Sequence, residues 1–273
     1  MTSGAGDKVP RSHAFLDLSD YARPFARWLV QRLLPTAVTP PQLTLAFTLA
    51  GLAAAGLLAA QRWLLLAGGL ILLKSALDAA DGALARARQR PSRVGRFLDS
   101  LADFVVNVAL FGALGYLGWR QTGQAWYWLL AAAACVSALL QVSLFNHYYI
   151  RYRVQTGGDV TSQVQEGAGA GFAWDNPRHV RVLLRLYQAV YGWQDRWVAH
   201  LDHWANPRPA PLRPGFMTAV TVLGLGTQLL VIALCAALGQ PLLSLWLFVT
   251  VFNLYALALL ALRAAAARAR PNR

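Results

Sequence analysis

Long apolar runs alternate with short polar breaks along most of the chain. A helix rises about 1.5 Å per residue, so about 20 apolar residues in a row cross the hydrocarbon core of a bilayer. Several runs are close to that length. The pattern therefore predicts an all-α, polytopic membrane protein with six transmembrane helices. The predicted spans cover residues 43–60, 63–80, 97–118, 126–145, 216–238 and 242–262.

Two other stretches are amphipathic. Arginines alternate with large apolar side chains over 21–34, and tryptophans recur at helical spacing within 178–204. Such helices lie in the plane of the membrane interface. Four regions are therefore expected. They are a cytoplasmic N-terminus with an interfacial helix (1–38), spans one to four with the candidate active site (39–148), a cytoplasmic loop with an amphipathic helix (149–213), and spans five and six with a basic C-terminus (214–273).

Small and polar residues inside the spans predict finer features. Gly51, Gly112, Gly115 and Gly118 are of the kind that lets two membrane helices approach closely. Polar residues within 146–153 are expected to mark the exit of the fourth span, where they act as interface anchors or help to bind a second substrate. Residues 154–177 are rich in glycine and predict a loop.

Composition and charge support a membrane protein and suggest its orientation. The chain is 56% hydrophobic, and its net charge of +13 comes from arginines between apolar spans. Anionic lipid headgroups explain that charge better than nucleic acid does. With six spans, the side opposite the termini exposes only Arg62 and Arg120, so the side with the termini is expected to be cytoplasmic. Abundant arginine and alanine beside scarce lysine favour a bacterial cytoplasmic membrane.

A third of the twelve acidic residues lie in one short stretch, 75–107, in and beside predicted spans. Charges in membrane helices cost about 2.5–3.5 kcal/mol each on insertion scales, so these residues need partners. The first two lie on one face of a helix, the last two form a column four residues apart, and Pro91 predicts a bend between the pairs. A hairpin bent there would bring both pairs together. The four residues are Asp78, Asp81, Asp99 and Asp103.

Four carboxylates facing one cleft cannot all stay ionised without cations, and an oxygen-rich site suits Mg²⁺, Mn²⁺ or Ca²⁺. The set is large enough for two metals. Gly82 and Ala85 remove bulk on the same face, Arg86 offers a donor fork for phosphate, and Gly95 leaves space opposite. Lys74 lies one turn before Asp78 and is expected to pair with one of the carboxylates.

This pattern resembles a known signature. The order Asp78-x2-Asp81-Gly82-x2-Ala85-Arg86-x8-Gly95-x3-Asp99-x3-Asp103 is similar to the complete motif of the CDP-alcohol phosphotransferase family. The stretch 39–44 also resembles the segment that leads into that family's first span. The resemblance implies transfer of a substituted phosphate from a CDP-linked donor to an alcohol, with release of CMP. It implies two divalent cations, Mg²⁺ or Mn²⁺, held by the four aspartates. It also implies that Asp103 is the general base and that Gly82, Ala85, Arg86 and Gly95 contact the CDP moiety.

Within the family, residues 98–103 (LDSLAD) are similar to members that use CDP-diacylglycerol, although the residues that follow differ. We therefore expect that donor, an alcohol acceptor and, as is common in the family, a homodimer among membrane lipids. Transfer from CDP-choline or CDP-ethanolamine to a lipid alcohol is the alternative. A cation or proton transporter would spread its acids along a path. The clustering of the aspartates disfavours transport, and a lipid-recruiting scaffold would not depend on Asp99.

Overall fold

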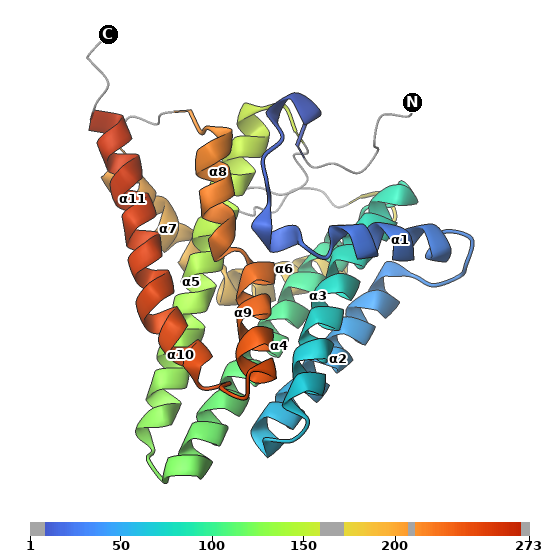
Figure 1. Ribbon diagram of the computed structural model, residues 1–273. Coiled ribbons are helices and arrows are strands. Elements are labelled where there is room, and N and C mark those ends of the chain that lie inside the picture. The colour runs from blue at the N-terminus through green and yellow to red at the C-terminus, as the bar shows by residue number, and fades with distance from the viewer. Residues whose placement is uncertain (1–8, 159–171, 207–210, 269–273) are drawn as a thin grey trace.

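The computed structural model describes residues 9–158, 172–206 and 211–268, and these residues contain helices and no strand (Figure 1). The main helices are α1 (Arg23–Leu33), α2 (Pro40–Ala60), α3 (Leu64–Ala87), α4 (Arg93–Thr122), α5 (Trp126–Gln155), α6 (Pro177–Val190), α7 (Gly192–Ala205), α8 (Pro214–Val220), α9 (Leu225–Ala237), α10 (Leu243–Leu247) and α11 (Asn253–Arg268). The described residues also contain three short 3₁₀-helices, η1 (Arg11–His13), η2 (Leu18–Asp20) and η3 (Thr221–Leu223), and a π-helical segment, η4 (Phe248–Phe252).

The number of helices that could cross a membrane is smaller than the sequence predicts. Within the described residues, α2, α4, α5 and the continuous stretch Leu243–Arg268 are long and apolar enough. A fifth span arises if α8 and α9, bent by 45° around Gly224, count as one. α3 has 24 residues, but its apolar part contains Lys74, Asp78 and Asp81. Length and composition therefore give four or five spans, and six are not confirmed.

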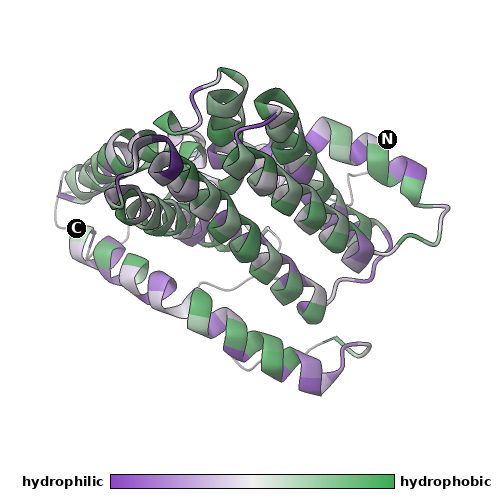
Figure 2. Ribbon diagram, turned by 90° about the horizontal axis from the view of Figure 1, so that it is seen from below, coloured by the Kyte–Doolittle hydropathy of each residue, from purple (hydrophilic) through white to green (hydrophobic). Residues whose placement is uncertain are grey.

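The bundle has two distinct ends. Figure 1 shows the end of α11 at the upper end, while the α2–α3, α4–α5 and α9–α10 turns lie at the lower end. Left-handed backbone at Gln61, Trp63, Gly123 and Gly239 reverses the chain at these turns. Viewed along the bundle, apolar residues dominate its helices, and polar residues mix with apolar ones in the peripheral helices (Figure 2).

Glycines bring neighbouring helices into close contact, as predicted for three of the four positions. A Cβ on Gly51 of α2 would lie 2.4 Å from Val106 of α4. A Cβ on Gly118 would lie 2.2 Å from the Tyr127 ring, and one on Gly115 would lie 2.8 Å from Ala131 of α5. Gly112 differs, because a Cβ there would meet nothing within 4 Å of it. The α2–α4 and α4–α5 contacts therefore depend on the absence of side chains.

The two amphipathic stretches are helical, but the second is divided. α1 matches the first, whereas the predicted helix over 178–204 is two helices that meet at Tyr191. Tyr191 ends α6, its hydroxyl donates to the Ser100 carbonyl of α4 at 2.8 Å, and a glycine begins α7. The apolar side of α6 packs through Val180 and Leu184 against Phe97 of α4. The apolar side of α6, the first half of the predicted interfacial helix, is therefore covered by α4.

Helix α5 extends further than predicted. It continues to Gln155, so the polar residues of 146–153 lie within the helix and not at its exit. Several of them are buried, including His147, Tyr148 and Arg153. Most of the predicted loop over 154–177 lies outside the described residues.

Residues 9–22, which we call the N-terminal strap, cross the upper end of the bundle. The Leu18 amide donates to Thr221 Oγ1 at 3.1 Å, and the Tyr152 hydroxyl donates to the His13 carbonyl at 2.8 Å. A Cβ on Gly226 of α9 would lie 1.8 Å from the Ser19 carbonyl oxygen. Only a glycine lets the strap lie this close to α9.

Candidate active site

The site begins with the hairpin of α3 and α4. Ser92 caps α4, because its hydroxyl accepts from the Gly95 amide at 3.0 Å. Asp175 holds the start of α4 from outside by accepting from the Ser92 hydroxyl at 2.6 Å and the Arg93 amide at 2.9 Å. Arg88 donates to three carbonyl oxygens of the α1–α2 connection. The bend predicted at Pro91 is therefore present and tied on two sides.

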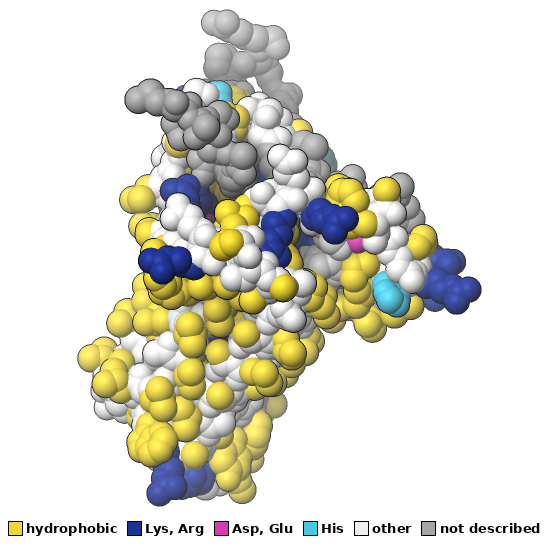
Figure 3. Space-filling model, turned by 90° about the vertical axis from the view of Figure 1, so that its right-hand side faces the viewer, with side chains coloured by type: hydrophobic (Ala, Val, Ile, Leu, Met, Phe, Trp, Pro, Cys, Tyr) yellow, Lys and Arg dark blue, Asp and Glu magenta, His cyan; other side chains and the backbone are white. Residues whose placement is uncertain are grey.

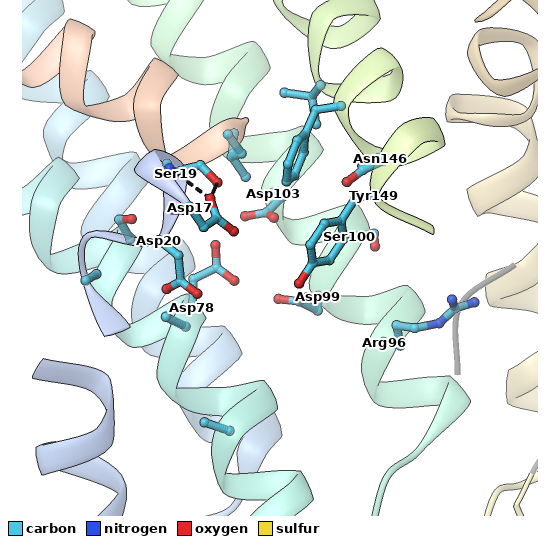
Figure 4. A pocket seen from close by; sticks show the side chains of 18 of the residues that line it. Asp17, Ser19, Asp20, Asp78, Arg96, Asp99, Ser100, Asp103, Asn146 and Tyr149 are labelled. Carbon is cyan, nitrogen blue, oxygen red and sulfur yellow. Dashed lines mark hydrogen bonds between the residues drawn. The ribbon is translucent and has the colours of Figure 1, made fainter. Parts of the chain in front are cut away.

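The hairpin brings three of the four predicted aspartates together. Asp78 of α3 and Asp99 and Asp103 of α4 each place a carboxylate oxygen within 4.8 Å of the other two. Figure 4 shows these side chains pointing into one space. Oxygens that converge in this way suit a hard divalent cation. Asp99 Oδ1 is buried and makes no hydrogen bond, which leaves it available for such an ion.

The fourth aspartate lies to one side of this group. Asp81 is buried, and its Oδ2 accepts a hydrogen bond of 2.7 Å from the Thr44 hydroxyl of α2. The helical spacing that places Asp78 and Asp81 on one face is correct, but the face is broad enough for them to turn to different neighbours.

Lys74 binds two of the clustered carboxylates. Its ammonium group donates to Asp78 Oδ2 at 2.8 Å and also to Asp103 Oδ1, and its side chain is only 1% exposed. The same nitrogen lies 4.7 Å from the centre of the Phe47 ring. Pairing with Asp78 is as predicted, while the bond across to Asp103 links α3 to α4.

The carboxylates line a cavity of ≈ 800 Å³. Arg86, the predicted phosphate ligand, lines it together with Arg96 and Arg153. Gly82, Ala85 and Gly95 are not among the described lining residues. Instead, a Cβ on Gly82 would lie 3.3 Å from Arg86 Nη1, so this glycine gives room to the Arg86 guanidinium.

The N-terminal strap forms a wall of the cavity that the sequence did not suggest. Asp17, Ser19 and Asp20 line the cavity, and Figure 4 places Asp17 and Asp20 near Asp78. Burial raises the pKa of Asp17, hydrogen bonds from Ser19 oppose the rise, and the net pKa lies above its ordinary value. The strap is more than 50 residues from the motif, so no local spacing could have indicated it.

Asn107 also lines the cavity, and its position could have been found from the sequence. It continues the column of Asp99 and Asp103 by another four residues. It is buried, and a buried amide inside a membrane helix is itself a sign of a polar site.

A second polar cluster joins α5 to α7 beside the cavity. Asp202 accepts from the Tyr148 hydroxyl at 2.7 Å, lies 3.2 Å from His147 Nε2 and forms an ion pair with Arg151. Burial raises the pKa of Asp202, but its bonds to His147 and Tyr148 and the charge of Arg151 outweigh burial and lower it. Three of the polar residues of 146–153, namely His147, Tyr148 and Arg151, therefore bind α7 to the bundle.

Comparisons with known proteins agree with the motif. The sequence model of the CDP-alcohol phosphatidyltransferase family matches residues 34–194. A "Bifunctional IPC transferase and DIPP synthase" of Thermococcus kodakarensis is 36% identical over 114 residues, which is 42% of this chain and 26% of that protein. Its namesake from Rubrobacter xylanophilus is 42% identical over 107 residues, which is 38% of this chain and 24% of that protein. The chain thus spans about a quarter of the length of these curated relatives.

A solved structure, the phosphatidylinositol phosphate synthase of Mycobacterium tuberculosis with CDP-DAG bound, is 20% identical. Its alignment covers 83% of this chain and 94% of that one, with a TM-score of 0.38. The family match is the stronger finding, since it covers more than half of the chain and includes the whole aspartate motif. This chain belongs to the CDP-alcohol phosphatidyltransferase family.

Proposed function

We propose that this protein is a membrane-embedded phosphatidyltransferase that transfers the phosphatidyl group of CDP-diacylglycerol to the hydroxyl of a small polar alcohol and releases CMP. The observation that carries the proposal is the convergence of Asp78, Asp99 and Asp103 on one cavity that Arg86 also lines. The stretch Leu98–Asp103 is similar to family members that use this donor.

The carboxylate cluster fits divalent cations. Asp78, Asp99 and Asp103 would hold Mg²⁺ or Mn²⁺, and the buried, unbonded Asp99 Oδ1 is the kind of atom that a cation satisfies. Asp81 is the fourth residue of the proposed set, which is sized for two cations. When bound, the cations supply positive charge to the donor pyrophosphate and the leaving CMP.

The chain's own residues would then position and deprotonate the substrates. Arg86 donates to phosphate oxygens of the donor. Asp103 accepts the proton of the acceptor hydroxyl. The acceptor oxygen bonds to the phosphorus of the phosphatidyl group as the bond to CMP breaks. Gly82 contributes by leaving the Arg86 guanidinium its space, and Ala85 and Gly95 are proposed to let the nucleotide approach the helices.

We also propose six membrane crossings, with α3 as one of them, so that the cavity opens toward the bacterial cytoplasm. The basic residues support this orientation, since the two reversals at the lower end have only two of them nearby, Arg62 in the α2–α3 turn and Arg120 in the last helical turn of α4. Figure 3 shows a largely apolar lower half that ends in a basic tip, with more basic side chains above it. A homodimer is part of the proposal and is measurable by light scattering in detergent.

The decisive experiment is CMP release from the purified protein. We expect CMP when CDP-diacylglycerol, Mg²⁺ or Mn²⁺ and one of a panel of small polar alcohols are all present. CDP-choline with diacylglycerol serves as the competing pair, and CMP from that pair alone would reassign the donor. A folded protein that releases no CMP with either donor, with each metal and every alcohol tested, would refute the transferase proposal.

A further inference from the structure

We infer that Lys74 is a positioning residue that stands in for a cation. In the metal-free protein its ammonium holds the carboxylates of Asp78 and Asp103 together, and it gives them up when a divalent cation binds. The inference rests on the proposed metal site, and it adds a competition between the protein's own charge and the metal.

The contacts of Lys74 are those of a built-in counterion. Its nitrogen lies 2.8 Å from Asp78 Oδ2 on α3 and contacts Asp103 Oδ1 on α4, so a single charge joins the two halves of the hairpin. The Phe47 ring of α2 holds the ammonium from a third side, 4.7 Å from the ring centre. The side chain is 1% exposed, so water cannot replace these partners.

The choice of residue supports this role. The chain has 25 basic residues, and only Lys8 and Lys74 are lysines. An ammonium is a compact charge with three donors on a flexible stem, whereas a guanidinium is a rigid planar fork. A compact charge can sit between two carboxylates and retract along its stem when another cation arrives.

Competition follows from the geometry. Lys74 binds Asp78 and Asp103, and these residues belong to the group whose oxygens converge within 4.8 Å. The third member, Asp99, has an oxygen that no protein group bonds, so the cluster is only partly satisfied by Lys74. A divalent cation brings more charge to the same oxygens, and it must displace the ammonium or share them with it. The lysine therefore weakens metal binding while it protects the metal-free site from the repulsion among its carboxylates.

The test measures metal binding and thermal stability separately. Lys74→Met keeps the length of the side chain and removes its charge, Lys74→Arg keeps the charge, and Arg62→Met at the exposed lower turn is the matched control. Purified proteins are unfolded by heat in EDTA and in Mg²⁺, and Mn²⁺ affinity is measured by electron paramagnetic resonance. We expect Lys74→Met to have a lower Tm than the wild type in EDTA, and its Tm should rise more than that of the wild type when Mg²⁺ is added. We also expect it to bind Mn²⁺ at least about fivefold tighter, which is a typical coupling between competing ligands. Lys74→Arg keeps a charge that cannot retract as the ammonium does, so it should bind Mn²⁺ more weakly than the wild type. Arg62→Met should bind Mn²⁺ as the wild type does.

The wild-type protein offers a second measurement that does not depend on how the variants fold. With only two lysines, protein labelled with isotopes at the lysine side chains gives two signals in nuclear magnetic resonance. Saturating Mg²⁺ should shift the Lys74 signal and leave that of Lys8 unchanged.

The outcomes separate this inference from the proposed function. An unshifted Lys74 signal in metal-loaded protein, or a Lys74→Met variant that binds Mn²⁺ equally or more weakly, would show that Lys74 does not compete. Such a result would leave the transferase proposal standing. If the wild type binds no divalent cation, the metal site itself fails, and the inference fails with it.

Discussion

At the scale of single residues, three aspartates from two neighbouring helices converge on one cavity. Spacing along two helices was enough to place Asp78, Asp99 and Asp103 together, because a bent hairpin has few ways to face its columns. Spacing could not show that Asp81 binds Thr44 or that Lys74 reaches across to Asp103. Those choices depend on which side chain of a neighbouring helix lies within about 3 Å, and the hydrophobic pattern does not contain that information.

Replacing Asp103 should lower the rate of CMP release while the protein still folds. Asp103→Asn keeps the size of the side chain but cannot accept the acceptor proton, and losing a general base typically lowers turnover by about 10²–10⁴-fold. We expect CMP release to fall by at least about 100-fold. Thermal unfolding and gel filtration should show that the protein keeps its fold. A variant with the turnover of the wild type would exclude Asp103 as the base.

At the scale of elements, the apolar pattern predicted which segments are helical, and their breaks and ends were harder to place. A single amphipathic run over 178–204 folds as α6 and α7, because Tyr191 bonds to α4 there. The bend at Gly224 and the wall formed by the N-terminal strap also depend on partners distant in sequence. Such contacts are decided by packing in three dimensions, which a repeat of 3.6 residues does not record.

The contact of α2 with α4 should tolerate no side chain at Gly51. In Gly51→Ala the new methyl would lie 2.4 Å from Val106, whose β-branched side chain cannot rotate away easily, so the helices must separate. Overpacking of this kind costs about 1–3 kcal/mol. Val106 is one turn from Asp103, so activity should fall as well. Unfolding in detergent and CMP release check both effects. Gly56→Ala, where a Cβ meets nothing within 4 Å, should lose neither stability nor activity.

The N-terminal strap should detach when Gly226 gains a side chain. A Cβ there would lie 1.8 Å from the Ser19 carbonyl oxygen, a distance that the backbone can relieve only by moving the strap away from α9. Hydrogen–deuterium exchange over residues 9–22 should therefore speed up in Gly226→Ala. The same substitution at Gly215, which has open space around it, should leave exchange unchanged. Equal exchange in both variants would mean that other contacts fix the strap.

The cluster around Asp202 that joins α5 to α7 should make the thermal stability of the protein depend on pH. The pKa of Asp202 is lowered in the folded protein, so its carboxylate stabilises the fold above the ordinary pKa near 4 and loses that effect as pH falls through the lowered value. Asp202→Asn should therefore lower Tm at pH 7, and its difference from the wild type should shrink as pH falls below about 4. Thermal scans of both proteins from pH 7 to pH 3 measure this. A constant difference in Tm across that range would contradict the assignment.

At the scale of the whole molecule, the distribution of charge supports the proposed direction of the site. The α3–α4 connection and the end of α11 lie at one end of the bundle, and the α2–α3 and α4–α5 turns lie at the other (Figure 1). Lysine and arginine near short loops favour the cytoplasmic side, and the lower reversals have only Arg62, in the α2–α3 turn, and Arg120, in the last helical turn of α4. The α3–α4 connection alone contains Arg88 and Arg90. A cavity lined by α3 and α4 near that connection would receive a water-soluble acceptor from the cytoplasm.

Orientation can be measured directly with single cysteines. Arg90→Cys reports the α3–α4 connection, and Arg62→Cys and Arg120→Cys report the lower turns, in a background where Cys135 and Cys235 are replaced by alanine. A maleimide that cannot cross membranes should label positions 62 and 120 in intact bacterial cells and position 90 only after the cells are opened. The expectation follows from the positive-inside rule and the proposed six spans, so it does not depend on the transferase chemistry. Labelling of position 90 from outside would turn the cavity away from the cytoplasm. Labelling of positions 62 and 90 from the same side would show that α3 does not cross the membrane, and the six-span arrangement would then be wrong.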